Sequence, residues 1–345
     1  MRPSLEKFNN SYSTVAPEEM DDIDRKLLIL IGVNPRVHLQ ELAEKLGISR
    51  QAVNHRMQLL TESGVIRGMS AGISISYLNA VPVAISGISR RTSMDDTLDR
   101  LGESELTRRA LVAAGNYLYV VGFLRNIHEL NGYVDFVRRA ADMTEPLVGV
   151  YCLDDGLTPS YPVDGSGSRP KKFKELSPLD LRIIASLRDN ARRPIADVSR
   201  MVGASAKTVR RHLERMISEG TMDMTATVDM ASGGDLLIIM HINLKNGADK
   251  IEFGKKLLAK QSFRDEYIRT HANLPSLVIW VFWSNKIAEI RRVLREVSEN
   301  EQVESAMINI AYFERMYPTW RDKLAEAQMR RNEKAGTQKS RSRSK

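Results

Sequence analysis

Residues Leu39–Leu60 read LQELAEKLGISRQAVNHRMQLL and contain two short amphipathic segments separated by Gly47-Ile48-Ser49. Glycine tolerates the left-handed backbone that often ends a helix, and a serine hydroxyl is a preferred cap for the start of the next one. The pattern predicts helices over Leu39–Leu46 and Arg50–Glu62. Two helices joined by so short a turn are typical of a helix-turn-helix, whose second helix enters the major groove of DNA.

A further helix is predicted over Asp21–Gly32, where apolar residues recur at helical spacing. In the second helix of the motif, Val53, Met57 and Leu60 share one face and should pack against the two preceding helices. The opposite face is then free for DNA. It carries the predicted contacts Ser49, Arg50, Gln51, Asn54, His55 and Gln58.

The whole motif recurs without a gap at a constant offset of 156 residues. Identities include Asp24/Asp180, Arg36/Arg192, Gly47/Gly203 and Ser49/Ser205, and the apolar positions between them recur as well. Such register over about forty residues indicates a duplication. The DNA contacts predicted in copy two are Ser205, Lys207, Arg210 and Arg211. Arginine recognises guanine, and asparagine or glutamine recognises adenine, so copy one has the richer base-reading chemistry and copy two suits phosphates and guanines.

After each motif the sequence predicts the order β-α-β-β-α-β, which is that of a ferredoxin-like unit. In copy one the expected elements are Val81–Ile88, Met94–Leu101, Thr107–Ala114, Tyr117–Leu124, Ile127–Ala141 and Val148–Leu153. In copy two they are Leu236–Leu244, Lys250–Ala259, Arg264–His271, Leu277–Phe282, Ile287–Val297 and Val303–Ile310. The fold class is therefore α+β. Helices cover one sheet face, so we expect the free faces of the two units to pair, within the chain or between chains.

The predicted domains follow from these patterns and from a Pro/Gly/Ser-rich stretch between the copies. They are an extension at 1–19, winged helix-turn-helix units at 20–77 and 176–231, ferredoxin-like units at 78–155 and 232–325, a linker at 156–175 and a disordered basic tail at 326–345. The segment Met329–Lys345 holds seven Lys/Arg and one Glu, which is most of the net charge of +8. DNA binding by the folded units therefore has to be argued from local surfaces, while the tail would add salt-sensitive attraction.

Other features restrict the class of protein. Cys152 is the single cysteine, which excludes an internal disulfide and a cysteine-based zinc site and suits a reducing cytosol. No apolar run approaches the ~20 residues that a membrane span needs. The histidines lack metal-ligand spacing, and no cofactor motif or nucleophile-plus-base group stands out. We expect a cytoplasmic, nucleoid-associated protein that is not an enzyme and has no metal, cofactor or catalytic residue.

Each half resembles the Lrp/AsnC (feast/famine) family of prokaryotic transcriptional regulators. The residues that carry the resemblance are Asp22–Leu28, Glu41–Ser49, Arg56 and Glu62–Ile66, with looser matches at Pro178–Ile184, Val202–Ser205 and Glu219-Gly220. The resemblance implies a sequence-specific regulator that binds double-stranded DNA and self-associates through ferredoxin-like (RAM) modules. It also implies an amino-acid effector. The usual member is one such unit, so a tandem chain departs from it.

Further departures concern the sites that the resemblance implies. The family's recognition-helix arginine is Arg56 in copy one but His212 in copy two. The loop that helps bind the effector corresponds to Gly115-Asn116-Tyr117 and, in copy two, to the stretch around Asn273, and neither keeps the usual Gly followed by Asp. Val65-Ile66-Arg67 and Ile73–Ile75 are predicted to form a wing beside the groove. Asp223 takes the place of Arg67 in copy two, which is unfavourable beside phosphate.

Two alternatives remain at this point. Siroheme decarboxylases of haem biosynthesis resemble the same two-module unit, and His271-Ala272-Asn273, with Trp280 and Trp283 downstream, hints at their histidine motif. An assembly or ligand-sensing protein that has lost DNA binding is the other. The favoured hypothesis is that paired ferredoxin-like units hold two recognition helices ~34 Å apart on DNA. Pairing within the chain predicts an asymmetric site, and pairing of like halves between chains predicts a palindrome.

Overall fold

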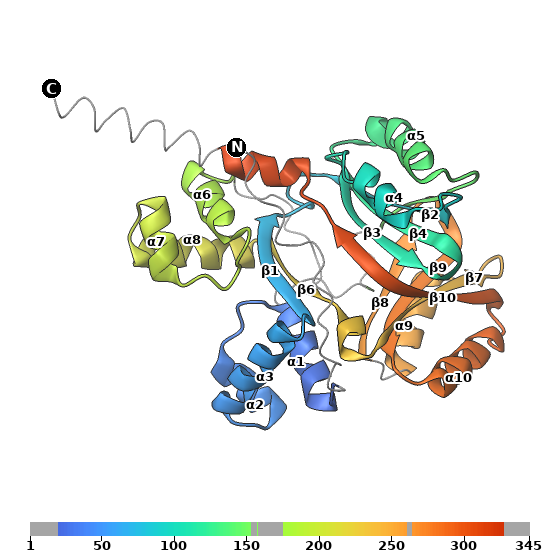
Figure 1. Ribbon diagram of the computed structural model, residues 1–345, viewed down its shortest axis with the longest axis horizontal. Helices are drawn as coiled ribbons and strands as arrows, with labels where there is room; N and C mark the ends of the chain where they lie inside the picture. Colours follow the sequence, from blue (N-terminus) through green and yellow to red (C-terminus); the bar gives the residue numbers. More distant parts are fainter. Residues whose placement is uncertain (1–19, 153–156, 158–174, 261–263, 328–345) are drawn as a thin grey trace.

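The computed structural model describes residues 20–152, 157, 175–260 and 264–327 (Figure 1). The predicted N-terminal extension, nearly all of the linker and nearly all of the basic tail lie outside these residues. Copy one contains α1 Asp22–Val33, α2 Leu39–Leu46, α3 Arg50–Glu62, β1 Ile66–Ile73, β2 Val81–Ile88, α4 Met94–Leu101, β3 Thr107–Ala113, β4 Tyr117–Leu124, α5 Leu130–Ala141 and β5 Leu147–Val150. Copy two contains α6 Pro178–Leu187, α7 Ile195–Val202, α8 Ala206–Ser218, β6 Met222–Val228, β7 Leu236–Leu244, α9 Lys250–Lys260, β8 Arg264–His271, β9 Leu274–Ser284, α10 Ile287–Ser298 and β10 Val303–Met316.

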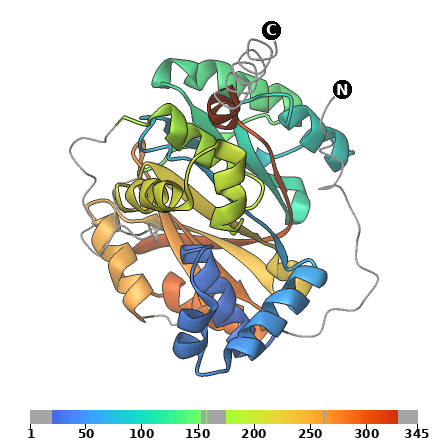
Figure 2. The same cartoon turned by 90° about the vertical axis from the view of Figure 1, so that its left-hand side faces the viewer.

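The two trihelical units lie side by side at one end of the molecule, with the ferredoxin-like part behind them (Figure 2). Each has its own buried core, which is built from the apolar positions that the helical spacing singled out. In copy one Leu27, Leu42 and Val53 are fully buried, and in copy two Ile183, Val198 and Val209 are. The predicted helix-turn-helix units and the α+β fold class are therefore confirmed.

A two-stranded antiparallel ribbon of β1 and β6 joins the trihelical units. Ile66 at one end of β1 packs in the core of copy one, whereas Ile73 at the other end packs in the core of copy two. Met222 in β6 likewise packs in copy two, and Val228 lies against copy one. Because each strand serves both cores, the ribbon fixes one unit relative to the other.

The ferredoxin-like units form one eight-stranded sheet with the order β5-β2-β4-β3-β10-β7-β9-β8. The junction is the antiparallel pair β10–β3, in which the last strand of copy two continues past its own sheet to pair with copy one. At the opposite edges Tyr151 forms a bridge with His271, and the Ala272 amide donates to the Val150 carbonyl at 2.8 Å. The sheet therefore closes almost completely on itself within a single chain.

The helices cover the outer face of this sheet, and the inner faces of the two halves meet. Their shared apolar cluster includes Leu111 and Tyr119 of copy one and Leu237 and Val281 of copy two. At the edge of this cluster Asn309 donates to the Tyr119 oxygen at 2.6 Å, and the Tyr119 hydroxyl forms a hydrogen bond with His241 Nε2 at 2.7 Å. Burial lowers the pKa of His241 to about 4, which keeps the ring neutral at pH 7. Face pairing occurs as predicted, whereas the edge pairing of β10 with β3 was not predicted.

A helix over residues 320–327 follows β10, where sequence analysis ends the second ferredoxin-like unit at 325 and starts a disordered tail at 326. The Tyr317 hydroxyl before it donates to the Leu98 carbonyl at 2.7 Å, and the Trp320 indole donates to the Phe123 carbonyl at 2.7 Å. Ala325 packs in the core of the copy-two helix-turn-helix. The end of copy two is thus docked on both copies, and the prediction of a disordered chain from 326 on is wrong for residues 326 and 327.

Candidate nucleic-acid interface

The turn of copy one has the geometry that its residues predict. Gly47 adopts φ 68° at the end of α2, where a side chain would be strained. The Ser49 hydroxyl accepts from the Ala52 amide at 3.1 Å and so caps α3. Val53 and Leu60 are buried beneath the helix. These contacts fix both the start of α3 and its rotation about its own axis.

Copy two reproduces this turn with different side chains around it. Gly203 adopts φ 67°, and the Ser205 hydroxyl accepts from the Thr208 amide at 3.1 Å to cap α8. Val209, Leu213 and Met216 are buried. The same glycine, cap and apolar positions therefore place α3 and α8 equivalently in their units.

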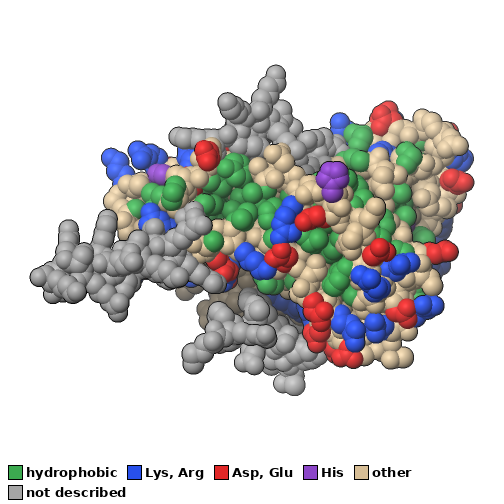
Figure 3. All heavy atoms as spheres, turned by 90° about the horizontal axis from the view of Figure 1, so that it is seen from above, with side chains coloured by type: hydrophobic (Ala, Val, Ile, Leu, Met, Phe, Trp, Pro, Cys, Tyr) green, Lys and Arg blue, Asp and Glu red, His purple; other side chains and the backbone are tan. Residues whose placement is uncertain are grey.

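The structure leaves every predicted DNA contact on the solvent side of these helices. The exposed side chains are Ser49, Arg50, Gln51, Asn54, His55 and Gln58 in copy one and Ser205, Lys207, Arg210 and Arg211 in copy two. Over the ferredoxin-like end of the molecule, by contrast, acidic and basic side chains are interspersed (Figure 3). A polar recognition face is therefore available in both units.

Arg56 does not belong to that face, although the family resemblance draws attention to it. Its guanidinium binds Asp21 at 2.8 Å and Asp24 at 2.7 Å, so it ties α3 to the start of α1. In copy two the replacement His212 binds Asp180 at 2.7 Å, and Arg215 binds the same carboxylate at 2.7 Å. Arg56 and His212 therefore both have a structural role, and the prediction that copy one has the richer base-reading chemistry rests on the residues of its outer face alone.

The segment that was predicted to form a wing in copy one has a different structure. Ile66–Ile73 is one continuous strand that pairs with β6, so Arg67 lies on the shared ribbon and forms an ion pair with Asp229. Asp223 does not lie in a wing of its own. It faces Arg321 of the C-terminal helix at 3.6 Å and accepts from the Ile75 amide at 3.4 Å. Burial raises the pKa of Asp223, although Arg321 opposes the shift.

Reciprocal contacts between matching arginines join the two units near their recognition helices. Arg36 donates to the carbonyls of Ala191 and Arg193, and Arg192 donates to those of Pro35 and Val37. Each arginine thus binds the equivalent pair of backbone carbonyls in the other copy. The Arg36/Arg192 identity is visible in the sequence, but no role was predicted for it. The repetition of an arginine at a predicted turn was the available signal.

One ion pair between the copies has no counterpart. The Arg25 guanidinium on α1 binds both carboxylate oxygens of Asp235 at 2.9 Å, and both residues are buried. At the matching positions Leu181 of copy two replaces Arg25, and Asn79 of copy one replaces Asp235. This pair fastens the copy-one unit to the start of β7 in copy two.

The effector-site candidates fall in two different environments. Gly115 and Asn116 both have positive φ and form the tight turn between β3 and β4, and Tyr117 starts β4. Asn273 instead holds β5 of the other copy, since its side chain accepts from the Val150 amide at 2.8 Å and donates to the Val148 carbonyl at 2.8 Å. The structure does not bring Asn273 together with the other three into one site.

Two further properties of the described residues bear on other functions. No group of three or more His, Cys, Asp or Glu side chains in this part of the chain is placed to hold a metal ion. None of its helices has the length and apolarity that a membrane crossing requires.

Comparison with known proteins agrees with this architecture. A family model described as winged helix-turn-helix DNA-binding matches residues 20–67 and again 176–221. The transcriptional regulator Ptr1 of Methanocaldococcus jannaschii is 32% identical over 133 residues, which are 38% of this chain and 86% of Ptr1. LrpA of Mycobacterium tuberculosis is 35% identical over 107 residues, which are 30% of this chain and 71% of LrpA.

A similarity of fold extends over nearly the whole tandem chain. The crystal structure of the siroheme decarboxylase NirDL superposes with a TM-score of 0.55 and covers 90% of this chain and all of that one, at 13% identity. At this identity the likeness concerns the fold alone. Both copies of the DNA-binding unit match the family model, and regulators at 30% identity or more are matched over at least two thirds of their length. The chain belongs to the Lrp/AsnC family of HTH-type transcriptional regulators.

Proposed function

We propose that this protein regulates transcription by binding an asymmetric duplex site with α3 and α8 in the major groove. The observation that carries the proposal is the pair of capped recognition helices with exposed polar faces, held together by the shared β1–β6 ribbon. Because the halves pair within one chain, a single molecule presents two different faces. The expected site therefore has two unlike half-sites about one helical turn apart.

The two helices have different tasks in this proposal. Copy one offers Asn54 and Gln51, which suit adenine. At the positions of Asn54, Gln51 and His55, copy two has Arg210, Lys207 and Arg211. Flexible cations bind phosphate without regard to sequence. We infer that α3 supplies most of the specificity and α8 most of the attraction to the backbone.

Selection of bound duplexes from a random pool, repeated at two salt concentrations, tests the proposal. We expect an enriched asymmetric motif that survives deletion of Met329–Lys345, whereas the affinity falls at high salt. The triple change of Arg50, Gln51 and Asn54 to alanine should abolish the enrichment and leave the fold intact. If the selection enriches no motif and deletion of the tail abolishes binding, the protein does not recognise a specific sequence.

The proposal also includes a small-molecule effector. An amino-acid effector, as the family resemblance implies, would be sensed near Gly115, Asn116 and Tyr117, because the Asn273 amide is already bonded to β5. Thermal unfolding in the presence of each amino acid should identify a ligand that raises the midpoint. Substitution of Asn116 should remove that rise.

An enzyme is the competing proposal, favoured by the fold that the chain shares with NirDL. The histidine that suggested it is packed rather than presented to a cavity. His271 is 3% exposed, its ring stacks on Tyr151 with centroids 5.0 Å apart, and a side chain on Gly149 would collide with it. We propose that the chain is not a decarboxylase. Decarboxylation of siroheme by the purified protein would reverse this assignment.

A further inference from the structure

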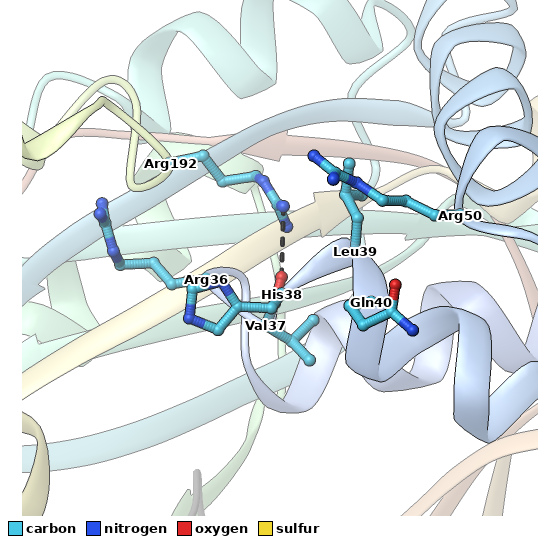
Figure 4. Close-up of a pocket in the computed structure, with 7 residues that line it drawn as sticks. All are labelled: Arg36, Val37, His38, Leu39, Gln40, Arg50 and Arg192. Carbon is cyan, nitrogen blue, oxygen red and sulfur yellow. Dashed lines mark hydrogen bonds between the residues drawn. The ribbon is translucent and has the colours of Figure 1, made fainter.

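A basic pocket of about 410 Å³ lies where the two helix-turn-helix units meet (Figure 4). Four of its lining side chains are arginine or histidine, and none is acidic. The lining residues are Arg36, Val37, His38, Leu39, Gln40, Arg50 and Arg192. Arg192 reaches across from copy two, and Arg50 is the first residue of the recognition helix α3. The pocket therefore joins the contact between the copies to the proposed DNA face.

Two arginines of this pocket, Arg36 and Arg192, have no acidic partner in the part of the chain that the structure describes. Among the described residues, all hydrogen bonds of their guanidinium groups are to backbone carbonyls of the other copy. Burial and then the like charge of Arg192 lower the pKa of Arg36, and burial lowers that of Arg192. A carbonyl satisfies hydrogen-bond geometry but carries no full charge, so an anion at this place would relieve the repulsion.

The two copies contribute matching residues to the contact between the helix-turn-helix units, but the pocket forms on the copy-one side of this contact. The residues that match His38, Gln40 and Arg50 at the offset of 156 are Pro194, Ala196 and Ala206. None of these three can donate a side-chain hydrogen bond. The reciprocal arginines are thus common to both sides, whereas the donors that complete a binding site occur on one side alone.

We propose that this pocket binds a phosphate group that bridges the two helix-turn-helix units. Arg36 and Arg50 of copy one and Arg192 of copy two are its ligands. Arginine suits this role because its planar fork matches two phosphate oxygens. The phosphate comes either from the backbone of the duplex between the half-sites, which rests on the function proposed above, or from a free phosphorylated metabolite. In both cases it stabilises one spacing of α3 and α8.

The first experiment tests the free ligand on the full chain without DNA. Inorganic phosphate and pyrophosphate are titrated by calorimetry at constant ionic strength. If the source is a free ligand, binding is saturable and weakens at least about tenfold in Arg192→Ala and in Arg50→Ala. Arg193→Ala is the matched control, since its side chain neighbours Arg192 but does not line the pocket. Arg192→Lys keeps a charge and should bind with intermediate affinity.

The second experiment tests the duplex. Each phosphate between the half-sites of a selected duplex is replaced in turn by an uncharged methylphosphonate. If the duplex supplies the phosphate, one or two central replacements should lower the affinity of the native protein for the duplex about tenfold. The same replacements should not lower the affinity of Arg192→Ala any further, whereas they should lower that of Arg193→Ala as they do for the native protein. If every replacement weakens native and Arg192→Ala proteins by equal factors, and phosphate does not bind alone, the pocket proposal is wrong. A chain that binds no duplex at all refutes the proposed function, and the first experiment then decides the pocket.

Discussion

The two recognition helices are fastened to their units by opposite arrangements of charge. Under α3 a single cation, Arg56, lies between two carboxylates, Asp21 and Asp24. Under α8 a single carboxylate, Asp180, lies between two bases, His212 and Arg215. Both clusters join the second helix of the motif to the first turn of the helix that opens the unit. The geometry is the same although the chemistry is inverted.

This inversion shows which part of the motif the fold requires. The fold requires an ion pair or hydrogen bond between these two helices, and the central group can be either a cation or a carboxylate. The side chain that matches Arg56 therefore says nothing about how well a copy reads DNA. In the proposed function, base reading depends on the outer face, where the copies differ, as Asn54 and Arg210 occupy matching positions.

The largest expected effect concerns the buried ion pair that fastens copy one alone. Arg25→Leu introduces the residue of copy two and leaves Asp235 buried without its partner, which should cost about 3–5 kcal/mol of the free energy of unfolding. Adding Asp235→Asn, which introduces the residue that copy one has at the matching position 79, should recover more than half of the loss. Urea unfolding of the native, single and double variants measures both steps. A double variant no more stable than Arg25→Leu would contradict this account.

The next effect concerns the two charge clusters themselves. Asp180 is fully buried and holds two bases, so Asp180→Asn should cost about 2–3 kcal/mol. Asp24→Asn should cost about 1 kcal/mol or less, because Asp24 is partly exposed and Asp21 still binds Arg56. Equal losses in urea unfolding would show that the clusters are equivalent after all.

The same carboxylate predicts an acid dependence. Burial alone would raise the pKa of Asp180, but hydrogen bonds from Ser177, His212 and Arg215 outweigh burial and lower it below the ordinary 3.8. The stabilisation is therefore complete above pH 3.8 and is lost as the pH falls through the lower folded value. The difference in the free energy of unfolding between the native protein and Asp180→Asn, measured by urea unfolding at several pH values, should therefore shrink as the pH falls below 3.8. A difference that grows toward low pH would contradict the assigned shift.

A smaller effect is expected on DNA in copy one. Asn54→Ala should cost about 1–3 kcal/mol on the selected duplex, because a bidentate contact to adenine is lost. The affinity for a random duplex should stay unchanged, and the base preference at one position should relax. Competition binding with duplexes that carry each base at that position measures this. An equal loss on selected and random duplexes would assign Asn54 to the backbone.

Much of the fold could be predicted from local patterns. Periodicity and turn residues were sufficient for α3, β2 and α4, whose bounds agree with the prediction. The exposed face of α3 followed from the spacing of Val53, Met57 and Leu60 alone. These features depend on residues within a few turns of one another, which is the range over which a sequence pattern carries information.

The features that were missed all depend on partners far away in the chain. The β1–β6 ribbon pairs residues 149 to 162 positions apart, and a hydrophobic strand pattern does not say which strand lies beside it. The extension of β10 beyond Ile310 follows from pairing with β3, which lies in the other copy. Likewise, Arg56 carries the same charge whether it faces a base or Asp24. Only the three-dimensional arrangement separates these two roles.

The smallest effect sharpens the contrast on the side of copy two. Arg210 matches Asn54 but has the chemistry of a phosphate contact, so Arg210→Ala should weaken binding to all duplexes alike by about 1 kcal/mol or less. The slope of log K against log salt should fall by about 1, since one fewer counterion is released. Titrations at several salt concentrations, with selected and random duplexes, measure both quantities. If Arg210→Ala instead relaxes the preference for one base and keeps the slope, then α8 reads sequence as α3 does, and the division of tasks between the copies has to be abandoned.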